Sequence, residues 1–145
     1  MSTQVTTDSS NTAHAALNGT SLSVSLTVKD LEQSVHWYSD IVGFAIDQKY
    51  ERDGQLSGVV VRAGAVRVLL NRDDGGRGWD RVKGEGFSLQ IITEQSIDAI
   101  ASAIRARGGV LGSEPADMPW GARVFRLSDP DGYRWTISSP RAPNV

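Results

Sequence analysis

Residues 21 to 29, SLSVSLTVK, alternate between apolar and polar side chains. Because successive side chains of a strand point to opposite faces, this period of two predicts a half-buried strand. Its apolar face would comprise Leu22, Val24, Leu26 and Val28. Asp30 follows as a candidate N-cap, and the next apolar residues have helical spacing. These are Leu31, Val35, Tyr38 and Ile41 or Val42. Gly43 is the expected end of this helix, since glycine readily adopts the left-handed conformation of a C-cap.

Three short strand patterns follow the helix, at Phe44–Glu51, about Gln55–Ala63 and Ala65–Asn71. A turn at Arg52-Asp53-Gly54 separates the first two, and Gly64 separates the last two. The first half of the chain therefore predicts one strand, one helix and three further strands.

The next segment, residues 72–85, has the sequence RDDGGRGWDRVKGE. It is rich in glycine and charge and has no apolar period, so we predict a mobile connection. The earlier order then begins again with a strand at Phe87–Thr93. A helix capped by Ser96 and ended by Gly108-Gly109 follows, and then a short strand at Val110–Ser113.

The stretch from Trp120 to Ser139 predicts a hairpin with strands at Arg123–Leu127 and Tyr133–Ser138. Pro130 presets φ for the turn between them, and Gly132 supplies a positive φ. One face of the second strand suits packing against a helix: Tyr133, Trp135 and Ile137. The other face carries the polar residues Arg134, Thr136 and Ser138, which need a polar environment. A ligand cleft is one candidate for that environment.

Composition excludes several classes of protein. The net charge of −2 does not favour nucleic-acid binding, and no apolar run reaches the roughly 20 residues of a membrane span. The absence of cysteine excludes disulfides and thiolate metal sites, and is compatible with the cytoplasmic location that we expect. Residues 1–20 lack the features of a signal peptide and read as a disordered tail, and residues 140–145 as a frayed end.

Two segments resemble a known family. SLTVKDLEQSVHWYSDIVGF is similar to the opening strand and helix of the vicinal oxygen chelate superfamily, and WGARVFRLSDPDGYRWTI is similar to its closing hairpin. This superfamily includes glyoxalase I, extradiol dioxygenases, fosfomycin-modifying enzymes and bleomycin-resistance proteins. The resemblance implies an α+β fold of two βαβββ modules, here residues 21–71 and 86–139, whose curved mixed sheets surround a cleft. It also implies a homodimer.

The same resemblance implies four positions for the ligands of a divalent metal, at Ser23, Leu69, Ser88 and Thr136. None of the four is a competent ligand, because such a metal needs imidazole or carboxylate donors. Shifting the two less certain positions finds only Gln90, a lone amide. The histidines do not help, since His14 falls in the tail and His36 reads as an ordinary helix residue. We therefore predict neither a metal nor another cofactor.

Strand alternation gives a second set of candidate site residues, on the faces opposite the helices. We predict ligand contacts by Ser23, Arg67, Leu69, Ser88, Gln90, Trp120, Arg134 and Thr136. Hydroxyl and amide groups could bind a neutral polar ligand, and Arg67 or Arg134 could pair with an anionic group. The alternatives are solvated positions on an open sheet and, for Trp120, a structural corner. Trp79 could stack on a ligand or pack at a dimer interface.

No set of residues predicts metal-free catalysis. There is no GxSxG motif, and carboxylates such as Asp47, Glu51 and Glu114 would act only if their strands turned toward the cleft. We therefore predict a protein that binds a small organic, antibiotic-like ligand without metal. The alternatives are a superfamily enzyme with isomerase, lyase or dioxygenase activity, metal-free or with unusual metal ligands, and an interaction domain. Whether the protein is an enzyme stays open at this point.

Overall fold

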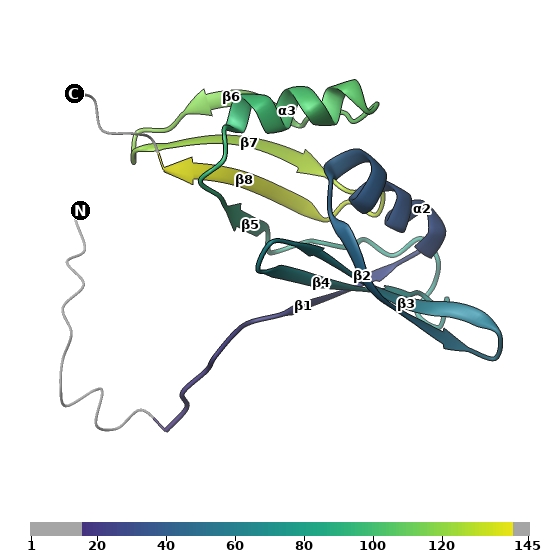
Figure 1. Ribbon diagram of the computed structural model, residues 1–145. Coiled ribbons are helices and arrows are strands. Elements are labelled where there is room, and N and C mark those ends of the chain that lie inside the picture. Colours follow the sequence, from purple (N-terminus) through teal and green to yellow (C-terminus); the bar gives the residue numbers. More distant parts are fainter. Residues whose placement is uncertain (1–15, 141–145) are drawn as a thin grey trace.

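The computed structural model describes residues 16–140, and the rest of the two expected tails lies outside these residues. Two units with the order strand, helix and three strands follow each other (Figure 1). The first unit consists of β1 (Val24–Val28), α2 (Leu31–His36), the π-helix η1 (Trp37–Val42), β2 (Ala45–Arg52), β3 (Gln55–Ala63) and β4 (Val66–Arg72). The second consists of β5 (Leu89–Ile92), α3 (Ile97–Ala106), β6 (Ser113–Asp117), β7 (Ala122–Ser128) and β8 (Arg134–Pro140).

The strands form two four-stranded mixed sheets, ordered β1-β4-β3-β2 and β5-β8-β7-β6. In each sheet the first and last strands of the unit are parallel neighbours, and the other pairs are antiparallel. Helix α2 contacts β3 and β4, and α3 contacts β6, β7 and β8. This arrangement confirms the predicted α+β fold with two βαβββ modules.

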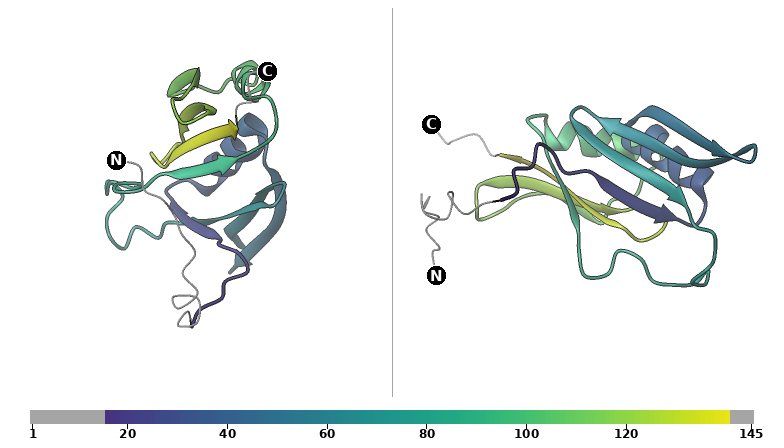
Figure 2. Two further views of the ribbon diagram at one scale, coloured as in Figure 1. Left: turned by 90° about the vertical axis from the view of Figure 1, so that its left-hand side faces the viewer. Right: turned by 90° about the horizontal axis from the view of Figure 1, so that it is seen from below.

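Each helix covers one face of its sheet and leaves the other face uncovered by a helix, as the three views together show (Figures 1 and 2). We call the uncovered faces the open faces. The strand registers place Ser25, Thr27, Val60, Arg62, Arg67, Leu69 and Asn71 on the open face of the first sheet. They place Gln90, Arg126, Ser128, Arg134 and Thr136 on the open face of the second.

The first helix begins and ends at the residues that the sequence predicts. The side chain of Asp30 accepts a hydrogen bond of 3.0 Å from the backbone N–H of Gln33, which caps the helix. Gly43 ends it with a φ of 111°, in the left-handed region that favours glycine. Between these ends, Leu31 and Tyr38 are fully buried, so this helix contributes directly to the core.

Three expectations for the strands are wrong. The short strand predicted at Val110–Ser113 lies at Ser113–Asp117 instead, and Val110 is 81% exposed. Pro115 is tolerated there because β6 is an edge strand, where a missing N–H need not interrupt the sheet. The opening strand begins at Val24, and Leu22, expected on its apolar face, is 97% exposed. In the same way β5 is shorter than the pattern predicts.

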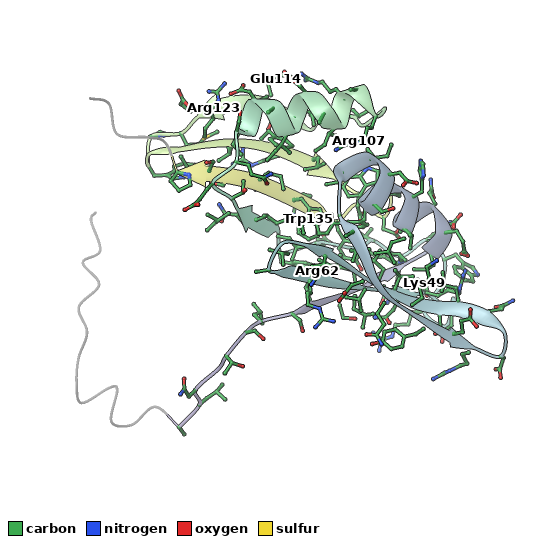
Figure 3. All side chains as sticks on the ribbon, in the orientation of Figure 1. Lys49, Arg62, Arg107, Glu114, Arg123 and Trp135 are labelled. Atoms are coloured by element: carbon green, nitrogen blue, oxygen red, sulfur yellow. The ribbon has the colours of Figure 1, made fainter. Side chains whose placement is uncertain are left out.

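A buried group of polar side chains joins the two modules. Tyr38 of η1 donates a hydrogen bond of 2.7 Å to the carboxylate of Asp129, and the indole N–H of Trp135 donates to the Tyr38 hydroxyl at 3.0 Å. Trp135 lies between the two sheets (Figure 3). Burial, together with the nearby Asp129 carboxylate, raises the pKa of Tyr38, so the phenol stays protonated and acts as the donor.

The connection between the modules is anchored at both ends. The Lys83 ammonium lies 2.9 Å from a carboxylate oxygen of Asp73 and 3.0 Å from one of Asp131, and all three side chains are almost fully buried. Asp131 also accepts a hydrogen bond of 2.8 Å from the backbone N–H of Lys29. Asp73 directly follows β4, and Asp131 belongs to the turn before β8, so Lys83 links both modules to the segment between them.

Candidate ligand-binding cleft

A cavity of about 460 Å³ opens on the second sheet. Its walls come from the residues before β5, from β7 and β8, and from the loop before β6. They are Gly86, Phe87, Ser88, Gly112, Arg126, Leu127, Ser128, Arg134, Trp135 and Thr136. This volume lies in the range of small-molecule sites, and the lining combines the exposed ring of Phe87 with several polar side chains. Three of the predicted site residues, Ser88, Arg134 and Thr136, therefore lie together.

The register of the closing hairpin positions these polar groups. Arg126 lies opposite Thr136, and Ser128 lies opposite Arg134, so all four side chains share the open face. The intervening residues point into the core, where Leu127 and Trp135 are 2% and 4% exposed. A one-residue shift of this register would exchange the two sets, so burial of Leu127 and Trp135 fixes the cavity's polar lining.

Arg134 is also tied to the end of the connection. Its guanidinium lies 3.4 Å from the carbonyl oxygen of Gly84 and 3.3 Å from that of Phe87, in long hydrogen bonds. These contacts hold Arg134 at the cavity and leave its other N–H groups available. The ring of Phe87 is 45% exposed beside it. A guanidinium and an accessible aromatic ring thus meet at one cavity.

The first sheet carries a second polar surface on its open face. Asn71 donates a hydrogen bond to the hydroxyl of Ser25 on the neighbouring strand, and Arg67 forms an ion pair of 3.2 Å with Asp47. Leu69 is half-buried and lies opposite Ser25. The predicted residues Arg67 and Leu69 therefore share one face, but they do not line the cavity on the second sheet.

The remaining predicted residues lie outside the cavity. Ser23 is exposed just before β1. Gln90 is exposed on β5, opposite Thr136 but not in the cavity wall. Trp120 is 67% exposed in the turn between β6 and β7. Trp79, also considered for a ligand role, packs across Gly75, where an added Cβ would come within 2.5 Å of its ring.

The positions at which the resemblance would place a metal hold Ser23, Leu69, Ser88 and Thr136, and hydroxyl and hydrocarbon side chains do not fit a divalent cation. In the structure Leu69 pairs with Ser25, and Thr136 with Gln90, so their surroundings supply hydroxyls and an amide. Within residues 16–140, no three His, Cys, Asp or Glu side chains gather in a way that could hold a metal ion. His36 is exposed and lies 2.8 Å from Asp40 on the same helix.

A larger hollow, of about 970 Å³, lies on the helical side between α3 and the turn from β3 to β4. It contains none of the predicted site residues. Arg107 lines this hollow, and its guanidinium donates hydrogen bonds to the carbonyl oxygens of Ile41 at 2.7 Å and Val42 at 3.1 Å. These bonds satisfy the end of η1. Because this hollow contains no predicted site residue and its arginine is already bonded to the backbone, the smaller cavity on the second sheet is the better candidate site.

Sequence reasoning missed two arginines of the open faces, Arg62 and Arg126. The predicted arginines, Arg67 and Arg134, lie on the last strand of each module, whereas Arg62 and Arg126 lie on the preceding strands β3 and β7. The hairpin alternation held the signal for Arg126, since it falls on the face opposite Phe125 and Leu127. Arg62 could not be placed without the register of β3 against β4, where it lies opposite Arg67.

Comparisons with known proteins identify relatives of the chain. The model of the Glyoxalase/Bleomycin resistance protein/Dioxygenase superfamily matches residues 13–137. A Synechocystis protein named "Probable lactoylglutathione lyase" is 29% identical over 115 residues, covering 75% of this chain and 86% of that protein. A lactoylglutathione lyase of Arabidopsis thaliana is 26% identical over 124 residues, covering 80% of this chain but 42% of its own length. The chain thus spans less than half of that plant relative.

Solved structures agree with this match at the level of the fold. A glyoxalase/bleomycin resistance protein/dioxygenase from Nocardioides superposes with a TM-score of 0.68 at 22% identity. The superposition covers 94% of this chain and 93% of that one. Among residues 16–140 no helix is long and apolar enough to cross a membrane.

Proposed function

Because the chain belongs to the Glyoxalase/Bleomycin resistance protein/Dioxygenase superfamily, we propose that it binds a small organic molecule on the open faces of its sheets. The cavity on the second sheet is the proposed core of this site. The proposed binding uses side chains of the protein alone, with no metal at the superfamily's position.

The proposal rests on one feature of the sequence: the four positions that the resemblance assigns to a metal hold Ser23, Leu69, Ser88 and Thr136. Hydroxyls are weak neutral ligands, and a leucine side chain has no donor atom. The same hydroxyls suit hydrogen bonds to a bound organic molecule. A cleft lined by such residues is better suited to binding than to metal-assisted chemistry.

We further propose that two copies of the chain complete the site. The cavity is lined by the second module only, while the open face of the first sheet carries polar groups that lie outside it. A second copy could place its first sheet over the cavity and enclose a ligand between them. Exposed Phe87 and Trp79 provide apolar area for such an association.

The competing candidate is an enzyme of this superfamily. It is favoured by the names of two relatives, a lactoylglutathione lyase at 26% identity and a "Probable lactoylglutathione lyase" at 29%. For this chain it would require metal ligands other than the residues at the superfamily's positions, or a reaction without metal. The binding proposal needs neither.

Metal analysis and ligand binding separate the two candidates. Purified protein should contain far less than one equivalent of Mn, Fe, Ni or Zn, and adding these metals after chelation should not raise its Tm. It should show no lactoylglutathione lyase activity. Stoichiometric metal together with a raised Tm, or lyase turnover, would favour the enzyme instead.

Planar aromatic compounds tested by thermal shift should raise the Tm of the wild-type protein, because ligands that bind the folded state stabilise it. Ser88→Trp should abolish this shift by filling the cavity, whereas Ser102→Trp, on the exposed side of α3, should leave it unchanged. Light scattering should give twice the mass of the chain. A monomer that binds ligand with full affinity would refute the shared site.

A further inference from the structure

The open faces of both sheets carry pairs of arginines. On the first sheet Arg62 lies directly opposite Arg67 in the pairing of β3 with β4. On the second sheet Arg126 of β7 lies diagonally across from Arg134 of β8. Figure 3 shows Arg62 on the lower side of the first sheet, away from both helices. Like charges directly opposite each other destabilise a sheet, and a bound anion would relieve the repulsion between neighbouring arginines.

Among residues 16–140, most of these arginines have no carboxylate partner. Arg67 has an ion pair with Asp47, but Arg62, Arg126 and Arg134 form no ion pair within that range, and Arg134 donates long hydrogen bonds to two carbonyl oxygens. The contrast within one strand is informative. Arg123, on the helical face of β7, makes two hydrogen bonds of 2.8 and 2.9 Å to Asp98 of α3. Arg126, three residues later on the open face, has no such partner.

We infer that the ligand of this protein is a planar organic anion, whose anionic group is bound by Arg126 and Arg134 in the cavity on the second sheet. The inference rests on the proposed function, because it assigns a ligand class to the same site. The guanidinium group binds carboxylate and phosphate oxygens through paired N–H donors. The exposed ring of Phe87 at the same cavity would stack on the planar part.

The cavity geometry fits such a ligand. Its volume of about 460 Å³ accommodates one or two fused rings with an acidic substituent. Arg126 and Arg134 both line this volume, together with the hydroxyls of Ser88, Ser128 and Thr136, which can add neutral hydrogen bonds. A neutral ligand of the same shape would leave two guanidinium groups without a counter-charge and should bind less well.

Matched compounds test the charge directly. Calorimetry would compare 2-naphthoate and 2-naphthyl phosphate with neutral 2-naphthamide, using the full chain. At least one anion should bind ten or more times more tightly than the amide, and added NaCl should weaken only the anion. The stronger anion identifies whether the natural group is a carboxylate or a phosphate.

Variants locate the charge on the protein. Arg126→Gln and Arg134→Gln should each weaken the anion about tenfold or more, because each removes a charged hydrogen-bond donor. Arg126→Lys should retain part of the affinity. Arg105→Gln, which removes an arginine paired with Glu114 on the helical side, should change nothing. Tm values measured without ligand confirm that each variant is folded.

The outcomes separate this inference from the proposed function. If the amide binds as tightly as the anions and Ser88→Trp abolishes its binding, the site is real but the anion assignment is wrong. If the anions bind equally well to Arg126→Gln and Arg134→Gln, the assignment to these residues is wrong. If no compound binds, both the inference and the proposed function fail.

Discussion

At the scale of single residues, the buried carboxyl group of Asp129 accepts three hydrogen bonds. One of its oxygens accepts from Tyr38, and the other accepts from the backbone N–H groups of Asp131 at 2.9 Å and Tyr133 at 2.8 Å. Burial raises the pKa of Asp129 in spite of these bonds, which favour the charged form. Each donor therefore offsets part of the desolvation cost of a carboxyl group that fixes the closing turn.

Tyr38→Phe should lower the free energy of unfolding by about 1–3 kcal/mol, because it leaves buried polar groups without a partner. The change removes both the hydrogen bond to Asp129 and the acceptor of the Trp135 indole. Urea denaturation at neutral pH measures the effect. Tyr50→Phe is the matched control, since Tyr50 is 44% exposed, and should change stability little. Equal effects of both variants would contradict the role given to Tyr38.

Asp73 should make stability depend on pH. A hydrogen bond from the backbone N–H of Gly75, and then the contact with Lys83, lower the pKa of Asp73 from its ordinary value of 3.8. A carboxyl group with a lowered pKa in the folded state stabilises the protein above pH 3.8, and this contribution disappears as pH falls through the lowered value.

Asp73→Asn should therefore lower the Tm by several degrees at pH 7, and the difference from wild type should shrink below pH 3.8. Melting curves between pH 7 and pH 2.5 test this expectation. Asp80→Asn, in the exposed part of the same connection, serves as control and should follow wild type at every pH. If the Tm of Asp73→Asn lay equally far below that of wild type at every pH, the ionisation of Asp73 would not be the cause.

At the scale of secondary-structure elements, the predictable parts were those with a strict period and a local stop signal. Helix α3 begins where Ser96 suggests, and Ile97, Ala101 and Ile104 are buried along one side. Strand β6 was misplaced because Val110 and Leu111 looked like a strand, whereas pairing with β7 selects Ser113–Asp117. An edge strand has few buried side chains, so its own sequence contains little information about its limits.

The N-cap of α3 can be tested separately. The hydroxyl of Ser96 accepts a hydrogen bond of 3.2 Å from the backbone N–H of Ala99. Ser96→Ala should cost about 1 kcal/mol of stability in urea denaturation, because it leaves that N–H without a side-chain acceptor. Ser102→Ala, at an exposed position in the middle of the same helix, should be neutral or slightly stabilising. If Ser102→Ala lowered stability as much as Ser96→Ala, the loss would not come from the N-cap hydrogen bond.

At the scale of the whole molecule, the sequence predicts two modules but not how they are joined. Ser88, Arg134 and Thr136 could be assigned to one face by alternation, and the structure places them at one cavity. The junction could not be predicted, because Lys83 lies in a charged, glycine-rich segment with no period, and its partners are ten and 48 residues away. Contacts between charged residues so far apart are set by the tertiary fold alone.

The closing turn of the second module is fastened to the first by hydrogen bonds that do not depend on the chain between them. The hydroxyl of Tyr133 donates to the carbonyl oxygen of Thr27 at 2.9 Å, and Lys29 binds Asp131 through its backbone N–H. Cutting the chain after Gly78 should therefore leave two complementing fragments that copurify when coexpressed with a tag on one of them. Asp131→Ala should reduce their recovery, and fragments that never associate would show that covalent continuity is what keeps the halves together.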